Sequence, residues 1–359
     1  MNLKEVFHLM LRGGPGVCQV AVTNACNASC RFCSFPQVPT GKRVMADPAR
    51  LWRGLEALQA AGIRYLSFTG GEPLLYPELL PALARARQLG IHSIICTNGS
   101  LLTPARIREF KDGGLGTLII SMDAAAADLH DRHRGLPGLT AHIRGMMPWL
   151  NEAGLPPVAS VTLSRLVSDL GEMLRFLKDD MGFGRVTFSY PITRLHSSYL
   201  GFAEHHSVDF TPEELDRWFG QIKALKSHNS RPVILNPNLS LTDMQRQLRG
   251  LPGRFPCLAG FKYFYVDWDL QVFRCHFLRD TLGPLEEIHR VSPIRDGCTA
   301  CTIECYRDPS VFQFLAVSVA DSLAALRQGK WLKGLGALLH PYNFLSLAAL
   351  LEGRHWVGH

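Results

Sequence analysis

Three cysteines near the start of the chain have a spacing that could hold a metal centre. Residues 23–33 read TNACNASCRFC and place Cys26, Cys30 and Cys33 directly after an apolar run. Cysteines separated by three and then two residues can surround one centre, and thiolates are the ligands of iron–sulfur clusters. Three thiolates would bind three irons of a cubane and leave the fourth open. Structural zinc is the alternative, although zinc wants a nearby fourth ligand and the next cysteine is Cys96.

A second group of cysteines lies towards the C-terminus, within fewer than fifty residues. A hairpin formed by Phe264–Asp267 and Val272–His276 is expected inside this group, around Asp269-Leu270. In a cytoplasmic chain, clustered cysteines favour metal binding over disulfides, and tetrahedral zinc is the alternative to an iron–sulfur cluster. Glu304 stands among them and is expected to be exposed. The five cysteines are Cys257, Cys275, Cys298, Cys301 and Cys305.

The elements that must position these residues alternate between strands and helices. Short apolar runs rich in Val, Ile, Phe and Thr are typical of strands buried on both faces. Asp47-Pro48 and Thr103-Pro104 are N-terminal signals of intervening helices. Repeated β-α units predict a parallel sheet, with chemistry at the carboxyl ends of its strands. The predicted strands are Val17–Thr23, Tyr65–Thr69, Ser93–Thr97, Thr117–Met122, Val158–Leu163 and Arg185–Tyr190.

The second half of the chain departs from this alternation. Phe210–Ser227 is expected to be helical, because Thr-Pro-Glu-Glu stands at its start. Residues 232–251 are expected to form an irregular linker. The tail from Ser310 is expected to be helical and apolar, with interruptions near Gly334 and at His340-Pro341.

The cysteine triplet after the first strand resembles that of the radical S-adenosylmethionine (radical SAM) superfamily. The resemblance covers about residues 15–200 and extends to the ends of the next strands, which read TGGEP, TNG and SMD and are followed by an Arg-Gly pair. It implies a [4Fe–4S] cluster on the three cysteines, with S-adenosylmethionine on its open iron. In relatives the GGEP segment contacts the amino group of this cofactor, and the S-x-D segment lies near its ribose and methionine. The implied cofactor-binding residues are Gly70, Gly71, Glu72, Pro73, Asn98, Ser121, Asp123 and Arg134.

The C-terminal cysteines resemble the SPASM/twitch extension of this superfamily, which holds auxiliary [4Fe–4S] clusters. Five cysteines are too few for two fully ligated clusters, and Leu270 replaces the glycine usual in that pattern. The shorter, twitch version implies one auxiliary cluster on Cys257, Cys275, Cys298 and Cys301, with Cys305 as an alternative or structural thiol. A fully ligated cluster favours electron transfer, and hence oxidation or radical coupling.

The resemblance implies reductive cleavage of S-adenosylmethionine and abstraction of a hydrogen atom from a substrate. The expected electron donor is of the flavodoxin or ferredoxin type. Many peptide-modifying relatives carry an added N-terminal recognition domain, and few residues precede the first strand here. This favours a sugar, lipid or other small biosynthetic molecule as the substrate. Peptide or protein maturation is the alternative, and a non-catalytic zinc or iron–sulfur scaffold is the alternative of another class. No catalytic acid, base or hydrogen donor is identified.

The expected fold is α/β: a partial (β/α)6 TIM-like barrel, a small cysteine-rich C-terminal domain and a helical tail. The expected divisions are a radical SAM core at 1–200, a helix and linker at 201–255, a SPASM/twitch-like domain at 256–309 and the tail at 310–359.

Composition limits the setting of the protein. The net charge of +7 comes from scattered residues, so nucleic acid is not an expected partner. The first residues lack a secretory signal, and no stretch reaches about 18 uncharged apolar residues, the length of a membrane span. A cytoplasmic location is therefore expected. The apolar tail could pack on its own domain, lie on a membrane, or bind a lipid-like substrate.

Overall fold

The computed structural model describes residues 9–190, 207–227 and 232–353. A single mixed sheet forms the centre of this part of the chain, with strand order β10-β9-β8-β1-β2-β3-β4-β5-β6-β7. The strands are β1 (Gly16–Thr23), β2 (Ile63–Gly70), β3 (His92–Thr97), β4 (Leu115–Ser121), β5 (Val158–Thr162), β6 (Arg185–Ser189), β7 (Val233–Ile234), β8 (Tyr263–Val266), β9 (Gln271–Cys275) and β10 (Leu278–Pro284).

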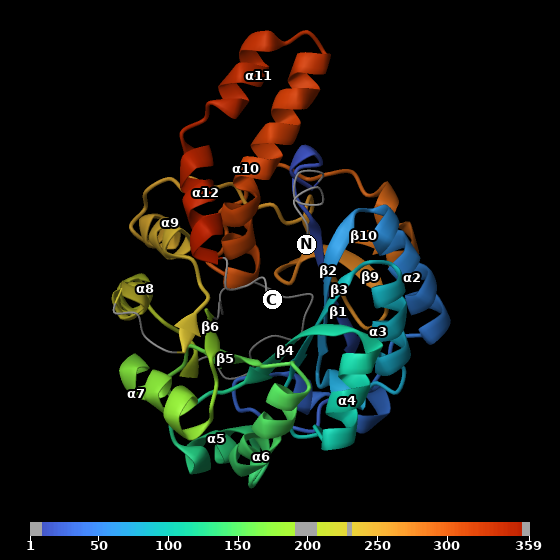
Figure 1. The fold of residues 1–359 in the computed structure, drawn as a ribbon, viewed down its shortest axis with the longest axis vertical. Coiled ribbons are helices and arrows are strands. Elements are labelled where there is room, and N and C mark those ends of the chain that lie inside the picture. The colour runs from blue at the N-terminus through green and yellow to red at the C-terminus, as the bar shows by residue number, and fades with distance from the viewer. Residues whose placement is uncertain (1–8, 191–206, 228–231, 354–359) are drawn as a thin grey trace.

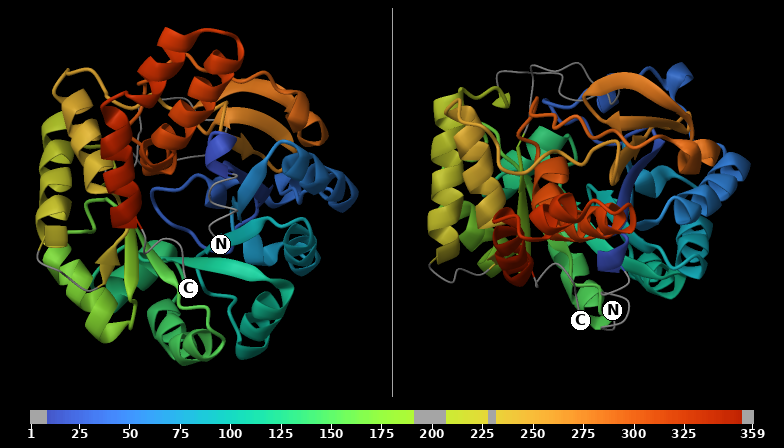
Figure 2. Two further views of the ribbon diagram at one scale, coloured as in Figure 1. Left: turned by 45° about the horizontal axis from the view of Figure 1, so that its top comes forward. Right: turned by 90° about the horizontal axis from the view of Figure 1, so that it is seen from above.

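Strands β1–β7 follow one another in chain order, and each is parallel to the next. The six predicted strands are confirmed to within two residues at each end. The sheet is open and curved, and the first helices lie on its outer side (Figures 1 and 2). The expected partial TIM-like barrel is therefore confirmed. Its parallel strands bring their carboxyl ends to one edge, where the cysteine triplet follows β1.

The helices start and stop where local signals favour it. Asp47 Oδ1 accepts a hydrogen bond from Arg50 N at 2.7 Å, and Thr103 Oγ1 accepts one from Arg106 N at 3.1 Å. Each cap satisfies a backbone N–H that the first helical turn leaves unpaired. The helices are α2 (Pro48–Ala60), α3 (Leu79–Gln88), α4 (Pro104–Gly113), α5 (Ala127–Arg134), α6 (Leu139–Glu152), α7 (Leu170–Arg175), α8 (Pro212–Ser227), α9 (Asn238–Leu248), α10 (Glu304–Arg327), α11 (Trp331–Leu338) and α12 (Tyr342–Glu352).

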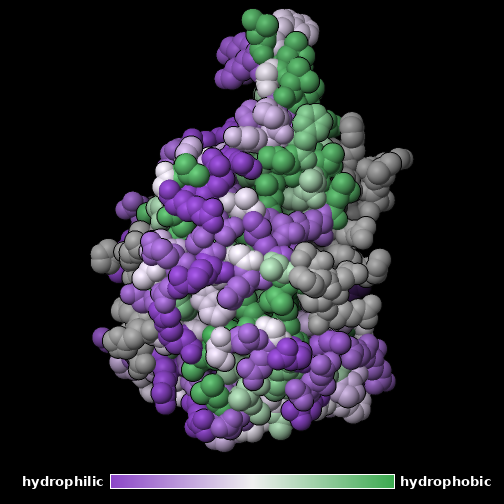
Figure 3. All heavy atoms as spheres, turned by 90° about the vertical axis from the view of Figure 1, so that its left-hand side faces the viewer, coloured by the Kyte–Doolittle hydropathy of each residue, from purple (hydrophilic) through white to green (hydrophobic). Residues whose placement is uncertain are grey.

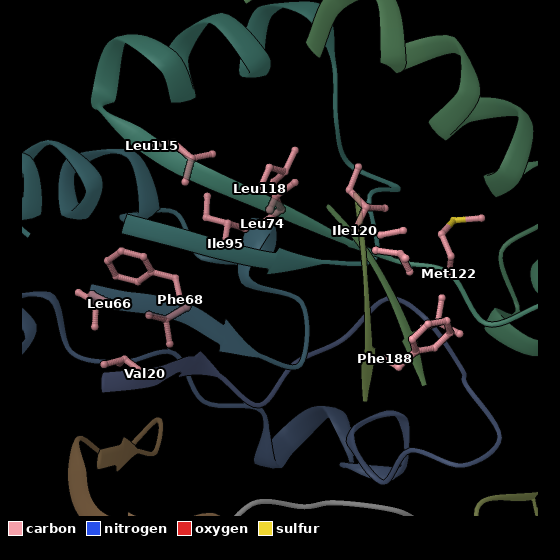
Figure 4. Packing of buried hydrophobic residues seen from close by; sticks show 14 of the residues in the cluster. Val20, Leu66, Phe68, Leu74, Ile95, Leu115, Leu118, Ile120, Met122 and Phe188 are labelled. Atoms are coloured by element: carbon pink, nitrogen blue, oxygen red, sulfur yellow. The ribbon is translucent and has the colours of Figure 1, made fainter. Parts of the chain in front are cut away.

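The two faces of the parallel sheet differ in polarity. Val20, Phe68, Ile95 and Leu118 occupy neighbouring register positions and are almost completely buried (Figure 4). They belong to the face that packs against the helices. Side chains alternate across a strand, so the adjacent residues, including Gln19, face the barrel interior. That interior is more polar, as a site for a polar cofactor requires.

The cysteine-rich extension continues the barrel sheet at the β1 edge. Strand β8 is parallel to β1, and β9 and β10 add to it in antiparallel pairs. The predicted hairpin is therefore confirmed as β8 and β9. Leu270 in its turn has a φ of 57° and is the only non-glycine residue with positive φ in the described part of the chain. This left-handed geometry explains why glycine is the usual residue there, since an L side chain is strained in it.

Two expectations about the second half of the chain are wrong. Residues 232–251 are not an irregular linker, because they contain β7 and α9. Leu241 and Met244 on α9 are buried, and their three-residue spacing was obscured by the surrounding Pro, Asn and Ser. The tail is helical but breaks before Trp331 rather than near Gly334, which lies inside α11.

The expectation that no stretch could span a membrane also needs correction. Helix α10 and the run Trp331–Glu352 are long and apolar enough by length and composition alone. Helix α10 bridges the two sides of the barrel: Glu304 contacts Ser189 of β6, and Gln313 Nε2 donates to the hydroxyl of Tyr263 on β8. Its apolar composition is therefore that of a packed helix. The second run is interrupted between α11 and α12.

Candidate functional site

The cysteine triplet forms a compact loop after β1. Ala28 N donates to Cys26 Sγ at 3.4 Å, and Cys33 N donates to Cys30 O at 3.0 Å. Burial, with a smaller contribution from the neighbouring thiols, raises the pKa of Cys26 to about 11 and that of Cys33 to about 12. Three thiols in such surroundings ionise only when a cation compensates their charge. The donor set therefore fits an iron–sulfur cluster.

The loop after β2 closes tightly onto the cysteine loop. Gly71 N donates to Thr23 O and Glu72 N donates to Ala25 O, both at 2.8 Å. A Cβ atom on Gly71 would lie 2.1 Å from Ala25 O, and one on Gly70 would lie 2.2 Å from Thr23 O. Only glycine permits this approach of two main chains. The GG pair thus fixes the position of the cysteine loop against the second strand.

Glu72 ties the ends of two strands together. Its carboxylate accepts hydrogen bonds from Thr97 Oγ1 at 2.6 Å, Asn98 N at 2.8 Å and Leu74 N at 3.0 Å. Burial raises its pKa, and these hydrogen bonds act in the opposite direction. A carboxylate has about four acceptor positions, so the chain itself occupies most of them. Contact of Glu72 with the cofactor's amino group stays a prediction, and its visible role is to organise the loops after β2 and β3.

The ends of β4 and α5 complete the edge through a buried ion pair. Arg134 Nε lies 2.6 Å from Asp123 Oδ2, and both side chains are buried. Arg134 O accepts a hydrogen bond from Ser29 N at 2.7 Å. Burial raises the pKa of Cys30, and the positive charge of Arg134 offsets part of that rise. Asp123 Oδ1 is buried without a hydrogen-bond partner among the described residues. The predicted residues of this edge thus meet around the cysteine loop, with an acceptor still to be satisfied.

The remaining predicted residues lie at the same edge. Asn98 Nδ2 donates to Asn27 Oδ1 at 2.9 Å, which links the third strand end to the cysteine loop. Ser121 ends β4, and Pro73 begins a short 3₁₀ turn after β2. The structure therefore places all eight predicted cofactor-binding positions at the carboxyl edge of the sheet, from which the cysteine loop also extends. Their contacts with S-adenosylmethionine stay predictions.

Four of the five C-terminal cysteines line one small cavity. Arg274 and Tyr306 contribute to its walls. Burial raises the pKa of each of Cys257, Cys275 and Cys301, and the thiols raise one another's pKa. Among the described residues, no three His, Cys, Asp or Glu side chains converge as ligands of a single metal ion. A cubane spreads its ligands over four irons, so four thiols around a cavity fit a cluster. The four are Cys257, Cys275, Cys298 and Cys301.

An ion pair holds the last part of this cavity in place. The Arg274 guanidinium binds both carboxylate oxygens of Asp296, at 2.6 and 2.5 Å, and its Nε donates to Ala259 O at 3.1 Å. Asp296 Oδ1 also accepts a hydrogen bond from Cys298 N at 3.1 Å. Arg274 directly precedes Cys275 in β9. It therefore links the strand that carries one cysteine to the loop that carries another.

Cys305 differs from the other four because it is absent from the cavity lining. Its thiol donates a hydrogen bond to Glu304 Oε1 at 3.3 Å. Burial raises the pKa of this thiol, and Cys96 of β3 is close enough to contribute to the rise. Glu304 accepts further hydrogen bonds from Ser189 Oγ at 2.6 Å and Tyr190 N at 3.1 Å. Glu304 is partly buried, so the expectation of a solvent-exposed side chain is wrong, and burial raises its pKa. Sequence reasoning missed this carboxylate, because its partners on β6 lie more than a hundred residues away.

Comparisons with known proteins agree with this geometry. Residues 20–183 match the family model of the radical SAM superfamily. The chain is 28% identical to an AdoMet-dependent heme synthase of Methanosarcina barkeri over 295 residues, which are 78% of this chain and 82% of the relative. It is 27% identical to a PqqA peptide cyclase of Gluconobacter oxydans over 288 residues, 76% of each chain. Residues 20–183 of this chain therefore form a radical SAM domain, and a C-terminal extension follows it.

Solved radical SAM structures share its fold. The anSMEcpe structure with bound AdoMet and the Cp18Cys peptide has a TM-score of 0.57 and 14% identity, over 94% of this chain and 99% of that one. SuiB of Streptococcus suis bound to S-adenosylmethionine has a TM-score of 0.57 and 16% identity, and this radical SAM chain aligns with 60% of its length. Membership of the superfamily means that S-adenosylmethionine and a [4Fe–4S] cluster are the cofactors.

Proposed function

We propose that this radical SAM enzyme modifies a peptide by hydrogen abstraction, and that four cysteines of the extension would hold an auxiliary [4Fe–4S] cluster, which would supply an electron acceptor. The observation that carries the proposal is the second set of cysteines: four thiols line a cavity in the extension. Four ligands leave no iron open for a substrate. The extension therefore suits electron transfer better than substrate binding, as an oxidation or radical coupling needs.

The peptide substrate rests on the relatives and replaces the small-molecule expectation from the sequence. The PqqA peptide cyclase of Gluconobacter oxydans matches over 76% of this chain. The shared fold also includes SuiB, solved bound to its precursor peptide SuiA, and anSMEcpe, solved with a peptide. A peptide can enter the open side of a partial barrel in an extended form, with one side chain reaching the interior.

The chain's own residues have distinct roles in this proposal. Cys26, Cys30 and Cys33 hold the first cluster, and the tight glycine contacts after β2 keep their loop in register. When bound, the cluster and S-adenosylmethionine supply a 5′-deoxyadenosyl radical that takes a hydrogen atom from the substrate. The buried Asp123–Arg134 pair supports the same loop from the other side and presents a free carboxylate oxygen.

An oxidation of this kind also needs a proton acceptor, and Glu304 is the candidate. Hydrogen abstraction followed by loss of one electron releases one proton from the substrate. The Glu304 carboxylate lies on the barrel side of the cysteine-rich extension, with hydrogen bonds to β6. Burial raises the pKa of Glu304, which makes its carboxylate a stronger base than that of an exposed glutamate. We infer that it accepts this proton; a cluster held by the four cavity cysteines would supply the acceptor for the electron.

A small-molecule reaction, such as the one named by the heme synthases, is the second candidate. One observation favours it: the Methanosarcina barkeri heme synthase matches 78% of this chain and is itself covered to 82%. The auxiliary cysteines would serve the same electron transfer in both cases.

Iron counting tests the two clusters. After anaerobic reconstitution we expect about eight irons per chain, four for each [4Fe–4S] cluster. Cys301→Ser should lower the count to about four, whereas the matched Cys305→Ser variant should keep about eight. A count near four in the unmodified chain would contradict the auxiliary cluster. An equal loss in both variants would contradict the choice of ligands.

Formation of 5′-deoxyadenosine tests the substrate class. Dithionite would replace a flavodoxin- or ferredoxin-type donor, and Cys26→Ala should abolish product formation. A low-molecular-mass extract of the source cells should stimulate the reaction, and protease treatment of the extract should remove the stimulation. Stimulation that survives the protease would favour the small-molecule candidate. No 5′-deoxyadenosine from fully reconstituted enzyme under any of these conditions would contradict both.

A further inference from the structure

Helices α11 and α12 expose an apolar surface that the proposed reaction does not use. Nine of the thirteen exposed large hydrophobic side chains in the described chain lie between Trp331 and Leu351. Leu332 is 90% exposed and Phe344 is 71% exposed. Figure 3 shows hydrophobic side chains gathered over the upper part of the molecule, where α11 projects in Figure 1. Single exposed leucines are ordinary, but a concentration of this kind marks a binding surface.

The charged side chains within the stretch that carries this surface are all basic. No acidic residue occurs from Ser322 to Leu351, whereas Arg327, Lys330 and Lys333 fall within that stretch. In the described part of the chain, none of these three cations forms an ion pair. Apolar side chains flanked by lysine and arginine complement the headgroup region of an anionic bilayer.

The geometry favours a helix pair that lies on a membrane rather than across it. Helix α11 has 8 residues and α12 has 11, and they are separated at His340-Pro341. At about 1.5 Å per residue neither reaches the roughly 30 Å of a bilayer core. Helix α12 is also attached to the body of the protein, because Ser346 Oγ donates to Val311 O at 2.7 Å and Ala349 is buried.

A second copy of this chain is a poorer occupant of the surface. In a two-fold interface the same patch meets itself. Arg327, Lys330 and Lys333 of both copies would then approach one another, with no acidic side chain between Ser322 and Leu351 to compensate them. An anionic lipid surface supplies the opposite charge.

We propose that α11 and α12 dock this enzyme on the surface of an anionic phospholipid bilayer. Leu332 and Phe344 enter the boundary between headgroups and acyl chains, and Lys330 and Lys333 contact the lipid phosphates. Helix α10 runs from Glu304 in the site to Arg327 at this surface, so docking fixes the barrel relative to the membrane. The inference is independent of the substrate.

Vesicle sedimentation of the reconstituted full chain tests the proposal. We expect binding to phosphatidylcholine vesicles that contain phosphatidylglycerol, weaker binding to phosphatidylcholine alone, and release at high salt. Leu332→Glu combined with Phe344→Glu should weaken partitioning by about tenfold or more, since each position loses an apolar side chain that would enter the bilayer. Lys330→Glu combined with Lys333→Glu should remove the preference for phosphatidylglycerol. The control is Leu251→Glu, an exposed leucine outside the patch, which should bind like the unmodified chain.

Each outcome decides the proposal. Circular dichroism and 5′-deoxyadenosine formation show whether the variants are folded, because none of these residues belongs to the catalytic site. Failure of the folded, unmodified chain to sediment with either vesicle would overturn the proposal. So would a concentration-dependent dimer that Leu332→Glu dissociates without any vesicle binding. Equal loss of binding in the Leu251→Glu control would likewise overturn it.

Discussion

Removing the positive charge of Arg134 should leave the buried carboxylate of Asp123 without its partner. Arg134→Met keeps much of the side-chain volume and deletes the guanidinium that lies 2.6 Å from Asp123 Oδ2. His130 and His133 lie 3.9 and 3.7 Å from the same oxygen. Burial lowers the pKa of His130 to about 4, so at pH 7 that ring is neutral and does not replace the lost charge.

The size of the effect follows from the burial of Asp123. Loss of one partner from a buried ion pair costs about 3–5 kcal/mol. The carboxylate can instead take a proton, and protonating at pH 7 a group whose ordinary pKa is 3.8 costs about 4 kcal/mol, at about 1.4 kcal/mol for each pH unit. We therefore expect a loss of about 3–4 kcal/mol in the free energy of unfolding at pH 7.

The loss in free energy of unfolding caused by Arg134→Met should be smaller at acidic pH. In the variant, the folded-state pKa of Asp123 lies above the unfolded value, so stability is retained at low pH and lost as pH rises. At pH 5 the cost of protonation falls to about 1.6 kcal/mol. In the unmodified chain the pKa of Asp123 is lowered, because Arg134 and the two histidines outweigh burial. Its contribution is then present above the unfolded pKa and is lost only as pH falls through the folded value.

Urea unfolding of the cluster-free protein, followed by tryptophan fluorescence at pH 7 and pH 5, measures both effects. Arg134→Met combined with Asp123→Asn should recover most of the stability, because no charge remains buried. Arg132→Met is the matched control: Arg132 is exposed and pairs only with Asp128 one turn away, so its loss should stay within about 0.5 kcal/mol. The reasoning fails if Arg134→Met costs no more than Arg132→Met, or if its cost is the same at both pH values.

Three further predictions concern the extension and its helix. Leu270→Gly should destabilise the folded chain by about 1–3 kcal/mol, because removing a buried leucine side chain costs more than the about 1–2 kcal/mol of left-handed backbone strain that glycine relieves. A higher melting temperature of the variant would contradict this. Burial raises the pKa of Asp308 to about 7, so stability should fall as pH rises from 5 to 8, and Asp308→Asn should flatten that slope in urea unfolding; an unchanged slope would count against it. Arg274→Gln should free Asp296 and the Cys298 loop, so that chelators remove up to half of the iron faster than from the unmodified chain; equal rates would exclude a supporting role for this pair.

Local sequence patterns determined the strands, the helix caps and the order of the motifs. A strand buried on both faces needs a short apolar run, and a cap needs a polar side chain within three residues, so both signals can be read along the chain. The cysteine triplet was predicted correctly at the carboxyl edge because parallel strands all end on one side. Helix α9 was missed because Pro237 and neighbouring polar residues hide its apolar spacing.

The resemblance already implied that Cys305 stands apart from the other four C-terminal cysteines, but only the tertiary structure gave the physical basis of that division and brought Glu304 against the end of β6. Cys301 and Cys305 lie four residues apart, yet one lines the cavity while the other contacts Glu304. That division depends on how α10 packs between β6 and β8, far away in the sequence. The same packing sets the exposure of α11 and α12, since an apolar helix is buried or exposed according to what covers it. Composition determines which side chains can bind metal, lipid or one another, and long-range packing decides which of them meet.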